Sequence, residues 1–79
     1  LRREEIEVNV PESETDVTVR VTLQAADSSM EWTYVSYVCA ADMGRTQLVT
    51  LEIPDGRSYV CLVYLDNVMS QRFEIEGVE

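Results

Sequence analysis

The fold of this chain is decided by the segment Ile53-Pro-Asp-Gly-Arg-Ser-Tyr-Val-Cys61. The residues before it alternate between apolar and polar, which is the pattern of a half-buried strand. Pro54 and Gly56 occupy positions that suit a tight turn. The residues after it, up to Leu65, are apolar at both parities, which indicates a strand that is covered on both faces. The segment therefore predicts two strands joined by a short turn, with Tyr59 and Cys61 on the same face of the second strand.

The same alternation extends from this segment toward both ends of the chain. It predicts strands at about 6–10, 17–23, 31–40, 49–53, 58–65 and 68–76, six or seven short strands in all, and no amphipathic helix. In the last strand we expect Met69, Phe73 and Ile75 to face inward. Asp66-Asn67 suits a two-residue hairpin turn, because both residues tolerate left-handed conformations. The segment 25–29 is long enough to cross from one sheet to another.

Two architectures fit this strand count. A continuous meander would leave an apolar face with nothing to cover it, whereas two packed sheets would bury that face. We therefore expect an all-β, antiparallel two-sheet sandwich. Residues 6–77 are predicted to form this single domain, and residues 1–5 an N-terminal extension or linker. Because the first residue is Leu1 rather than methionine, we expect the chain to be part of a longer protein, or a mature or engineered product.

The turn segment resembles a corner found in immunoglobulin-like domains. Asp55, Tyr59 and Cys61 have the spacing at which immunoglobulin domains begin their sixth strand, and Ile53, Gly56 and Tyr59 have the spacing of a fibronectin type III corner. The resemblance implies an immunoglobulin-like sandwich. It also implies a structural corner, in which the ring of Tyr59 packs in the core and its hydroxyl bonds back to the loop that contains Asp55.

The cysteines depart from the immunoglobulin pattern. That family has its first cysteine on the second strand, where this chain has valines. The only cysteine in this chain besides Cys61 is Cys39. The resemblance implies that the strands predicted at 31–40 and 58–65 are antiparallel neighbours, so that Cys39 and Cys61 could form a disulfide worth roughly 3 kcal/mol. The alternative is two buried free thiols. A disulfide would indicate an oxidising compartment, so we expect an extracellular or cell-surface location.

The charge and composition exclude several function classes. Fifteen acidic residues against six arginines give a net charge of −9, which repels nucleic acid and anionic membranes. No apolar run is long enough to be inserted into a membrane. The absence of histidine and lysine removes imidazole and Schiff-base catalysis, and no glycine-rich phosphate loop is present. We therefore expect no enzymatic activity, no cofactor and no metal site, since zinc needs about four ligands and the acidic loops lack calcium-binding spacing.

The strand predicted at 58–65 offers a second apolar face that could contact a partner. If the disulfide forms, the partner-binding residues on that face are Trp32, Tyr34, Val60, Leu62 and Tyr64; otherwise Val35 and Tyr37 replace Trp32 and Tyr34. The alternative is that neighbouring strands cover these side chains.

These residues lead us to expect a non-catalytic protein-interaction or adhesion module of a larger secreted or surface protein, with a protein partner or a homodimer. The alternatives are a structural spacer domain, or an engineered or de novo designed sandwich with no ligand. A carbohydrate-binding module is a weaker option, and it would need two exposed aromatic rings.

Overall fold

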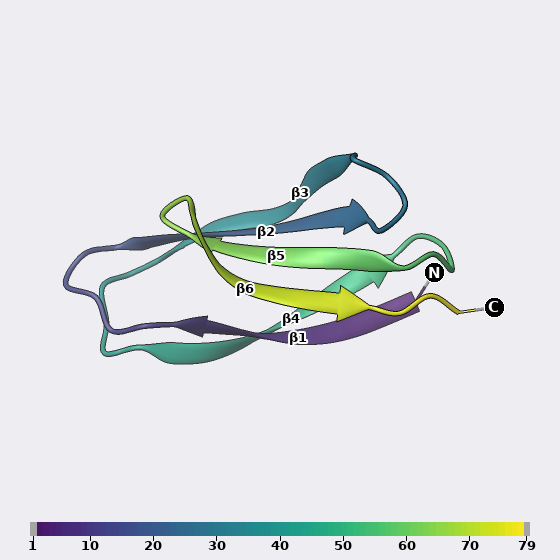
Figure 1. The fold of residues 1–79 in the computed structure, drawn as a ribbon. Coiled ribbons are helices and arrows are strands. Elements are labelled where there is room, and N and C mark those ends of the chain that lie inside the picture. Colours follow the sequence, from purple (N-terminus) through teal and green to yellow (C-terminus); the bar gives the residue numbers. More distant parts are fainter. Residues whose placement is uncertain (1, 79) are drawn as a thin grey trace.

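The computed structural model describes residues 2–78 and contains, over that range, six strands and no helix. The strands are β1 (Arg2–Val10), β2 (Val17–Ala25), β3 (Glu31–Cys39), β4 (Arg45–Ile53), β5 (Tyr59–Leu65) and β6 (Val68–Ile75). They form two antiparallel sheets packed together, a two-stranded sheet of order β1-β4 and a four-stranded sheet of order β3-β2-β5-β6 (Figure 1). The prediction of a small all-β sandwich is confirmed.

Three connections change sheet and two are hairpins. The chain crosses between the sheets from β1 to β2, from β3 to β4 and from β4 to β5. Asp66 and Asn67 have φ angles of 49° and 66°, which is the left-handed geometry of a two-residue hairpin turn between β5 and β6. Gly44 has a φ of 104° where the chain turns into β4, a conformation that favours glycine. The segment 25–29, which was predicted to cross between the sheets, instead lies at the hairpin connection between the neighbouring strands β2 and β3.

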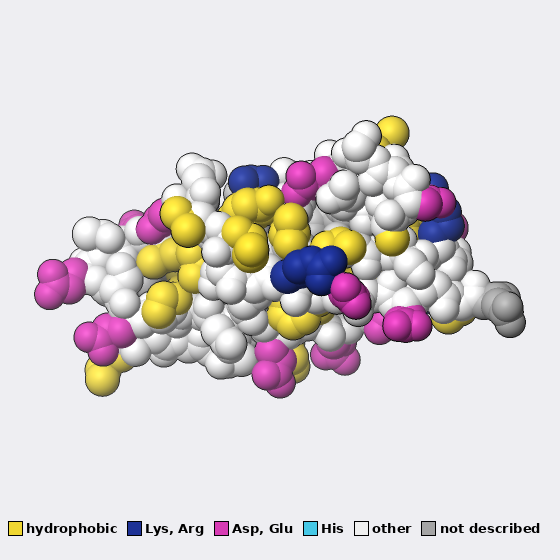
Figure 2. Space-filling model, viewed as in Figure 1, with side chains coloured by type: hydrophobic (Ala, Val, Ile, Leu, Met, Phe, Trp, Pro, Cys, Tyr) yellow, Lys and Arg dark blue, Asp and Glu magenta, His cyan; other side chains and the backbone are white. Residues whose placement is uncertain are grey.

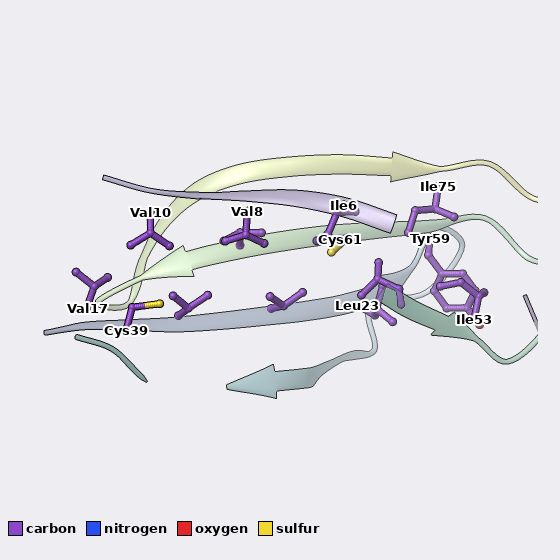
Figure 3. Packing of buried hydrophobic residues seen from close by; sticks show 14 of the residues in the cluster. Ile6, Val8, Val10, Val17, Leu23, Cys39, Ile53, Tyr59, Cys61 and Ile75 are labelled. Atoms are coloured by element: carbon purple, nitrogen blue, oxygen red, sulfur yellow. The ribbon is translucent and has the colours of Figure 1, made fainter. Parts of the chain in front are cut away.

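The core lies between the sheets and is built from alternate residues of every strand. The buried apolar side chains are Ile6, Val8, Val10, Val17, Val19, Val21, Leu23, Ala25, Cys39, Leu51, Ile53, Tyr59, Cys61, Val63 and Ile75 (Figure 3). Trp32 closes one end of this core, with its ring edge-on to the ring of Tyr59 at a centroid distance of 5.9 Å. The parity of the apolar residues therefore determines which face of each strand is buried.

The first strand is longer than the sequence predicts. It begins at Arg2, so residues 2–5 form part of the sheet rather than an extension. The alternation there is hidden because its inward positions are polar: the guanidinium of Arg2 donates to the carbonyl oxygens of Asp55, Arg57 and Glu76 at 3.3, 2.8 and 2.8 Å. A half-buried strand end can thus have a charged residue where its neighbours supply acceptors.

A bulge in β3 changes which of its side chains face the core. Val21 of β2 lies opposite Val35, but the next residue, Thr22, lies opposite Thr33, so Tyr34 is an extra residue in β3. Side chains on both sides of the bulge therefore turn inward, and Trp32, Tyr34, Val35 and Tyr37 all pack against the core. The prediction that Trp32 and Tyr34 point outward is wrong, because it assumed an uninterrupted alternation along this strand.

A second bulge affects β6. Val63 lies opposite Gln71, and the following residue, Tyr64, lies opposite Met69, which leaves Ser70 unpaired in the register. Met69 is therefore turned to the outside of the sheet, where 54% of it is exposed. Its predicted inward orientation is wrong for the same reason as in β3.

The two cysteines are free thiols, and the predicted disulfide is absent. The prediction needed β3 and β5 to be neighbours, but β2 lies between them. Cys39 lies opposite Val17 and Cys61 opposite Leu23, which separates them by about 20 Å along β2 at a rise of about 3.3 Å per residue (Figure 3). A disulfide tolerates Cα atoms at most about 7 Å apart. With no disulfide, the expected extracellular location loses the observation that supported it.

Candidate interaction face

The outer side of the four-stranded sheet is the side that faces away from β1 and β4, and we call it the open face. The strand register places the following residues on it: Thr18, Arg20, Thr22, Gln24, Glu31, Thr33, Ser36, Val38, Val60, Leu62, Tyr64, Met69, Arg72 and Glu74. No other strand within residues 2–78 covers this side.

An apolar band runs along β5 on the open face and reaches β6. Its centre is Val60, Leu62 and Tyr64 of β5, which are half-buried by their neighbours. Met69 extends the band to β6 and is 54% exposed, whereas Val38, which is 63% exposed, lies on β3 beyond the polar side chains of β2. The structure thus brings together three of the five residues predicted for partner binding, and adds Met69, which was predicted to face inward.

The side chains around this band hold each other in place. The guanidinium of Arg20 lies 4.1 Å from the centre of the Tyr64 ring, in a cation–π contact. The hydroxyl of Thr22 donates to Glu31 Oε2 at 2.6 Å, and the Tyr64 hydroxyl donates to the same oxygen at 3.4 Å. Thr22 is fully buried here without an unsatisfied polar atom. A partner would therefore meet side chains that are already ordered, which lowers the entropic cost of binding.

The two outer surfaces of the sandwich differ in charge. The open face has two arginines, Arg20 and Arg72, and two glutamates, so its formal charges cancel. The outer side of β1 and β4 has three glutamates and one arginine, and among its exposed residues is one large apolar side chain, Leu48. In Figure 2 hydrophobic side chains gather around arginines in the middle of the view, whereas acidic side chains stand mainly at the left end and along the lower margin. The open face is thus close to neutral on a protein with a net charge of −9.

The exposed edges of the two-stranded sheet are each bridged by one side chain from the other sheet. On β1, the amide of Gln71 accepts from the backbone N–H of Asn9 at 2.9 Å and donates to the carbonyl of Glu7 at 3.0 Å. On β4, the hydroxyl of Tyr34 accepts from the N–H of Glu52 at 3.0 Å and donates to the carbonyl oxygen of Thr50 at 3.3 Å. Unpaired strand edges invite pairing with other chains, and these two contacts reduce that exposure.

The corner between β4 and β5 has the hydrogen bond that the resemblance implies. The hydroxyl of Tyr59 donates to Asp55 Oδ1 at 2.9 Å, while the ring is buried in the core. The N–H and Nε of Arg57 donate to the same carboxylate at 3.0 and 3.1 Å. The backbone N–H of Arg57, more than any other contact, lowers the pKa of Asp55 below its ordinary value. The corner therefore works best with Asp55 ionised.

Both thiols are buried. The side-chain amide nitrogen of Gln47 lies 3.4 Å from Cys39 Sγ. The oxygen of the same amide accepts a hydrogen bond from the hydroxyl of Tyr37 at 2.6 Å. Burial raises the pKa of Tyr37, with a smaller contribution from Cys39. Burial also raises the pKa of Cys61 to about 11, so this thiol stays protonated at neutral pH. Both thiols thus lie among packed side chains.

Two further kinds of feature are not found in the described part of the chain. Across residues 2–78 no group of three or more cysteine, aspartate or glutamate side chains is placed to hold a metal ion. Over the same range there is no helix of the length and apolarity needed to cross a membrane.

Comparisons with protein-family models, with curated proteins and with solved structures give no match to this chain.

Sequence reasoning left Met69 and Arg20 out of this face for identifiable reasons. The bulge in β6 reverses the parity that would have placed Met69, and a bulge has no clear signature in a single sequence. Arg20 stood in the sequence as a polar position of an alternating strand, and only the pairing of β2 with β5 places it opposite Tyr64. The outward residues of β5 are the part of the open face that the sequence predicts correctly.

Proposed function

We propose that this chain is a non-catalytic protein-interaction module of a larger protein, and that the open face is its contact surface. The observation that carries the proposal is the apolar band formed by Val60, Leu62, Tyr64 and Met69, which no strand of residues 2–78 covers. An apolar band rimmed by polar residues commonly marks a protein-binding surface. The aromatic ring and the arginine at its centre are the residue types that contribute most at protein interfaces.

The order of the strands supports an immunoglobulin-like assignment for this module. An immunoglobulin sandwich pairs strands B and E in one sheet and strands C′, C, F and G in the other. The orders β1-β4 and β3-β2-β5-β6 correspond to these if β1 is the equivalent of strand B. Tyr59 then begins the equivalent of strand F, where the family has its corner tyrosine. In this correspondence β1 is equivalent to strand B rather than strand A, so the strand at 31–40 is equivalent to strand C′ rather than strand C. That difference accounts for the wrong neighbour predicted for it.

The partner we propose is a second copy of the domain, paired open face to open face. Two molecules that each have a charge of −9 repel one another, and the open face is the surface where the formal charges cancel. Four strands about 4.8 Å apart and about 25 Å long give a contact area at the small end of specific interfaces. We therefore expect association in the micromolar to millimolar range, and we expect salt to strengthen it by screening the repulsion.

The test is sedimentation velocity from low micromolar to millimolar protein, at low and at high salt. The expected result is a concentration-dependent dimer that is weakened strongly by Val38→Glu or Met69→Glu. Both side chains are more than half exposed, so these substitutions should leave the fold intact. Leu48→Glu is the matched control, because it places the same charge on a side chain of similar exposure on the other sheet, and it should leave the dimer unchanged.

Two results would overturn the proposal. One is a monomer at millimolar concentration in high salt, which would favour a structural spacer instead. The other is a dimer that the open-face variants and the Leu48 control affect equally, which would place the contact elsewhere.

A further inference from the structure

The groove between β1 and β6 is a second surface on which this protein could bind a ligand, and it does not depend on the open face. It has a volume of about 420 Å³ and lies beside the first half of β1, the end of β6 and the segment 76–78. Ile6, Phe73, Ile75 and Val78 supply its apolar side chains. Grooves of this kind, beside a strand edge, are where extended peptides add to a sheet.

The edge of β1 is only partly bridged along this groove. Gln71 contacts the carbonyl of Glu7 and the N–H of Asn9, near the end of the strand. Backbone groups that point to one edge recur at every second residue, so those of Arg3 and Glu5 belong to the same edge as those of Glu7. No hydrogen bond to Arg3 or Glu5 from outside the sheet is found within residues 2–78. A short stretch of β1 therefore has backbone donors and acceptors available for a strand.

The charge of the groove determines what kind of strand fits. Glu4, Glu5, Glu74 and Glu76 line it, against one arginine, Arg2. The guanidinium of Arg2 is already occupied by three backbone carbonyls at one end of the groove. The groove therefore combines an apolar floor with an excess of negative charge.

We propose that this groove binds an extended, basic segment of a protein by adding it as a strand to the edge of β1. Side chains of a strand alternate between its two faces. One set would enter the space between the sheets, beside Phe73 and Ile75. The other set would lie on the outer surface beside Glu5 and Glu7, where lysine or arginine complements the carboxylates. The partner is thus a segment in which apolar residues alternate with basic ones.

The test uses two blocked synthetic peptides, one with four lysines alternating with three valines, and one with glutamates in place of the lysines. Each is titrated into isotopically labelled protein, and amide chemical shifts are recorded. The lysine peptide should shift the amides of residues 3–7 and 73–78, slow the hydrogen exchange of the Arg3 and Glu5 amides, and bind less tightly as salt is raised. The glutamate peptide should not bind. Because salt is expected to strengthen pairing of the open faces, the two proposals fail independently.

Charge variants test the acidic lining. The double substitution Glu5→Gln and Glu76→Gln should weaken binding of the lysine peptide about threefold to tenfold, as expected for two exposed charge pairs. The control Glu12→Gln and Glu14→Gln makes the same change in net charge in the loop at the far end of β1 and should have a much smaller effect. Equal effects of the two double variants would show that only net charge matters, and would overturn the proposal.

A backbone variant tests strand addition itself. Glu5→Pro removes one edge N–H of β1 and should abolish binding, whereas Leu48→Pro removes the matching N–H from the edge of β4 and should not. Wild-type affinity in a folded Glu5→Pro variant, or peptide-induced shifts that map to the open face, would overturn the proposal. If Glu5→Pro does not fold, the charge variants alone decide.

Discussion

The bridge formed by Tyr34 gives the sharpest test of how the two sheets are held together. Its hydroxyl makes two hydrogen bonds to the edge of β4, at 3.0 Å to the N–H of Glu52 and at 3.3 Å to the carbonyl of Thr50. Tyr34→Phe removes both bonds and almost nothing else, because the ring still packs against the core. The edge groups that lose their partner can turn to water, so no buried polar group is left unsatisfied.

The expected cost follows from these two bonds. A neutral hydrogen bond contributes about 0.5–1.5 kcal/mol, and the longer of the two is the weaker, so we expect a loss of about 1–2 kcal/mol in the free energy of unfolding. For a domain of this size, 1 kcal/mol corresponds to a fall in Tm of about 4–8 °C. Urea unfolding followed by tryptophan fluorescence and circular dichroism measures the loss.

The matched control is Tyr64→Phe, whose hydroxyl makes a 3.4 Å contact to Glu31 on the open face. That contact does not join the sheets, so the control should cost less than about 0.5 kcal/mol. Gln71→Ala removes the corresponding bridge on the β1 side, and the double variant with Tyr34→Phe should show additive losses, because the two bridges share no residues. A Tyr34→Phe protein as stable as wild type would refute the idea that this hydroxyl holds β4 in place.

Three further results are expected. Tyr59→Phe should destabilise the domain, and its difference in stability from wild type should shrink as the pH falls below 3.8, the ordinary pKa of Asp55. The reason is that a carboxylate whose pKa is lowered in the folded state stabilises the fold above its unfolded-state pKa and loses that effect when it is protonated. Acid titration of both proteins measures this, and an unchanged difference down to pH 2 would speak against the corner bond. Cys61 should react with a thiol reagent at pH 8 at least roughly a hundredfold more slowly than in urea, because it is buried and protonated, and fast labelling of the folded protein would contradict its placement. Leu51→Ala should cost about 2–5 kcal/mol in urea unfolding, against less than about 0.5 kcal/mol for Leu48→Ala, and similar losses would mean that the two faces of β4 are assigned wrongly.

The sequence predicted most of what depends on local alternation and turn chemistry. The strand positions, the turn at Asp66 and Asn67, and the shared face of Tyr59 and Cys61 all follow from neighbouring residues. These features are local because the side chains of a strand alternate with a period of two and turn residues act on their own backbone.

What the sequence could not reveal was which strands pair and where the register shifts. Placing β2 between β3 and β5 depends on contacts between distant residues, and the resemblance to a family suggested the wrong neighbour for β3. That one error produced the predicted disulfide between Cys39 and Cys61. The bulge at Tyr34 then reversed part of the predicted face, because one inserted residue exchanges the two sides of a strand.

The central position of β2 is the claim on which the open face and the free thiols both depend. It is tested most directly by nuclear Overhauser effects between backbone protons of neighbouring strands. The structure predicts contacts from Val21 to both Val35 of β3 and Val63 of β5, and none that link Val35 to Val63 directly across the backbone. Direct backbone contacts between Val35 and Val63, with Val21 contacting neither, would contradict this strand order.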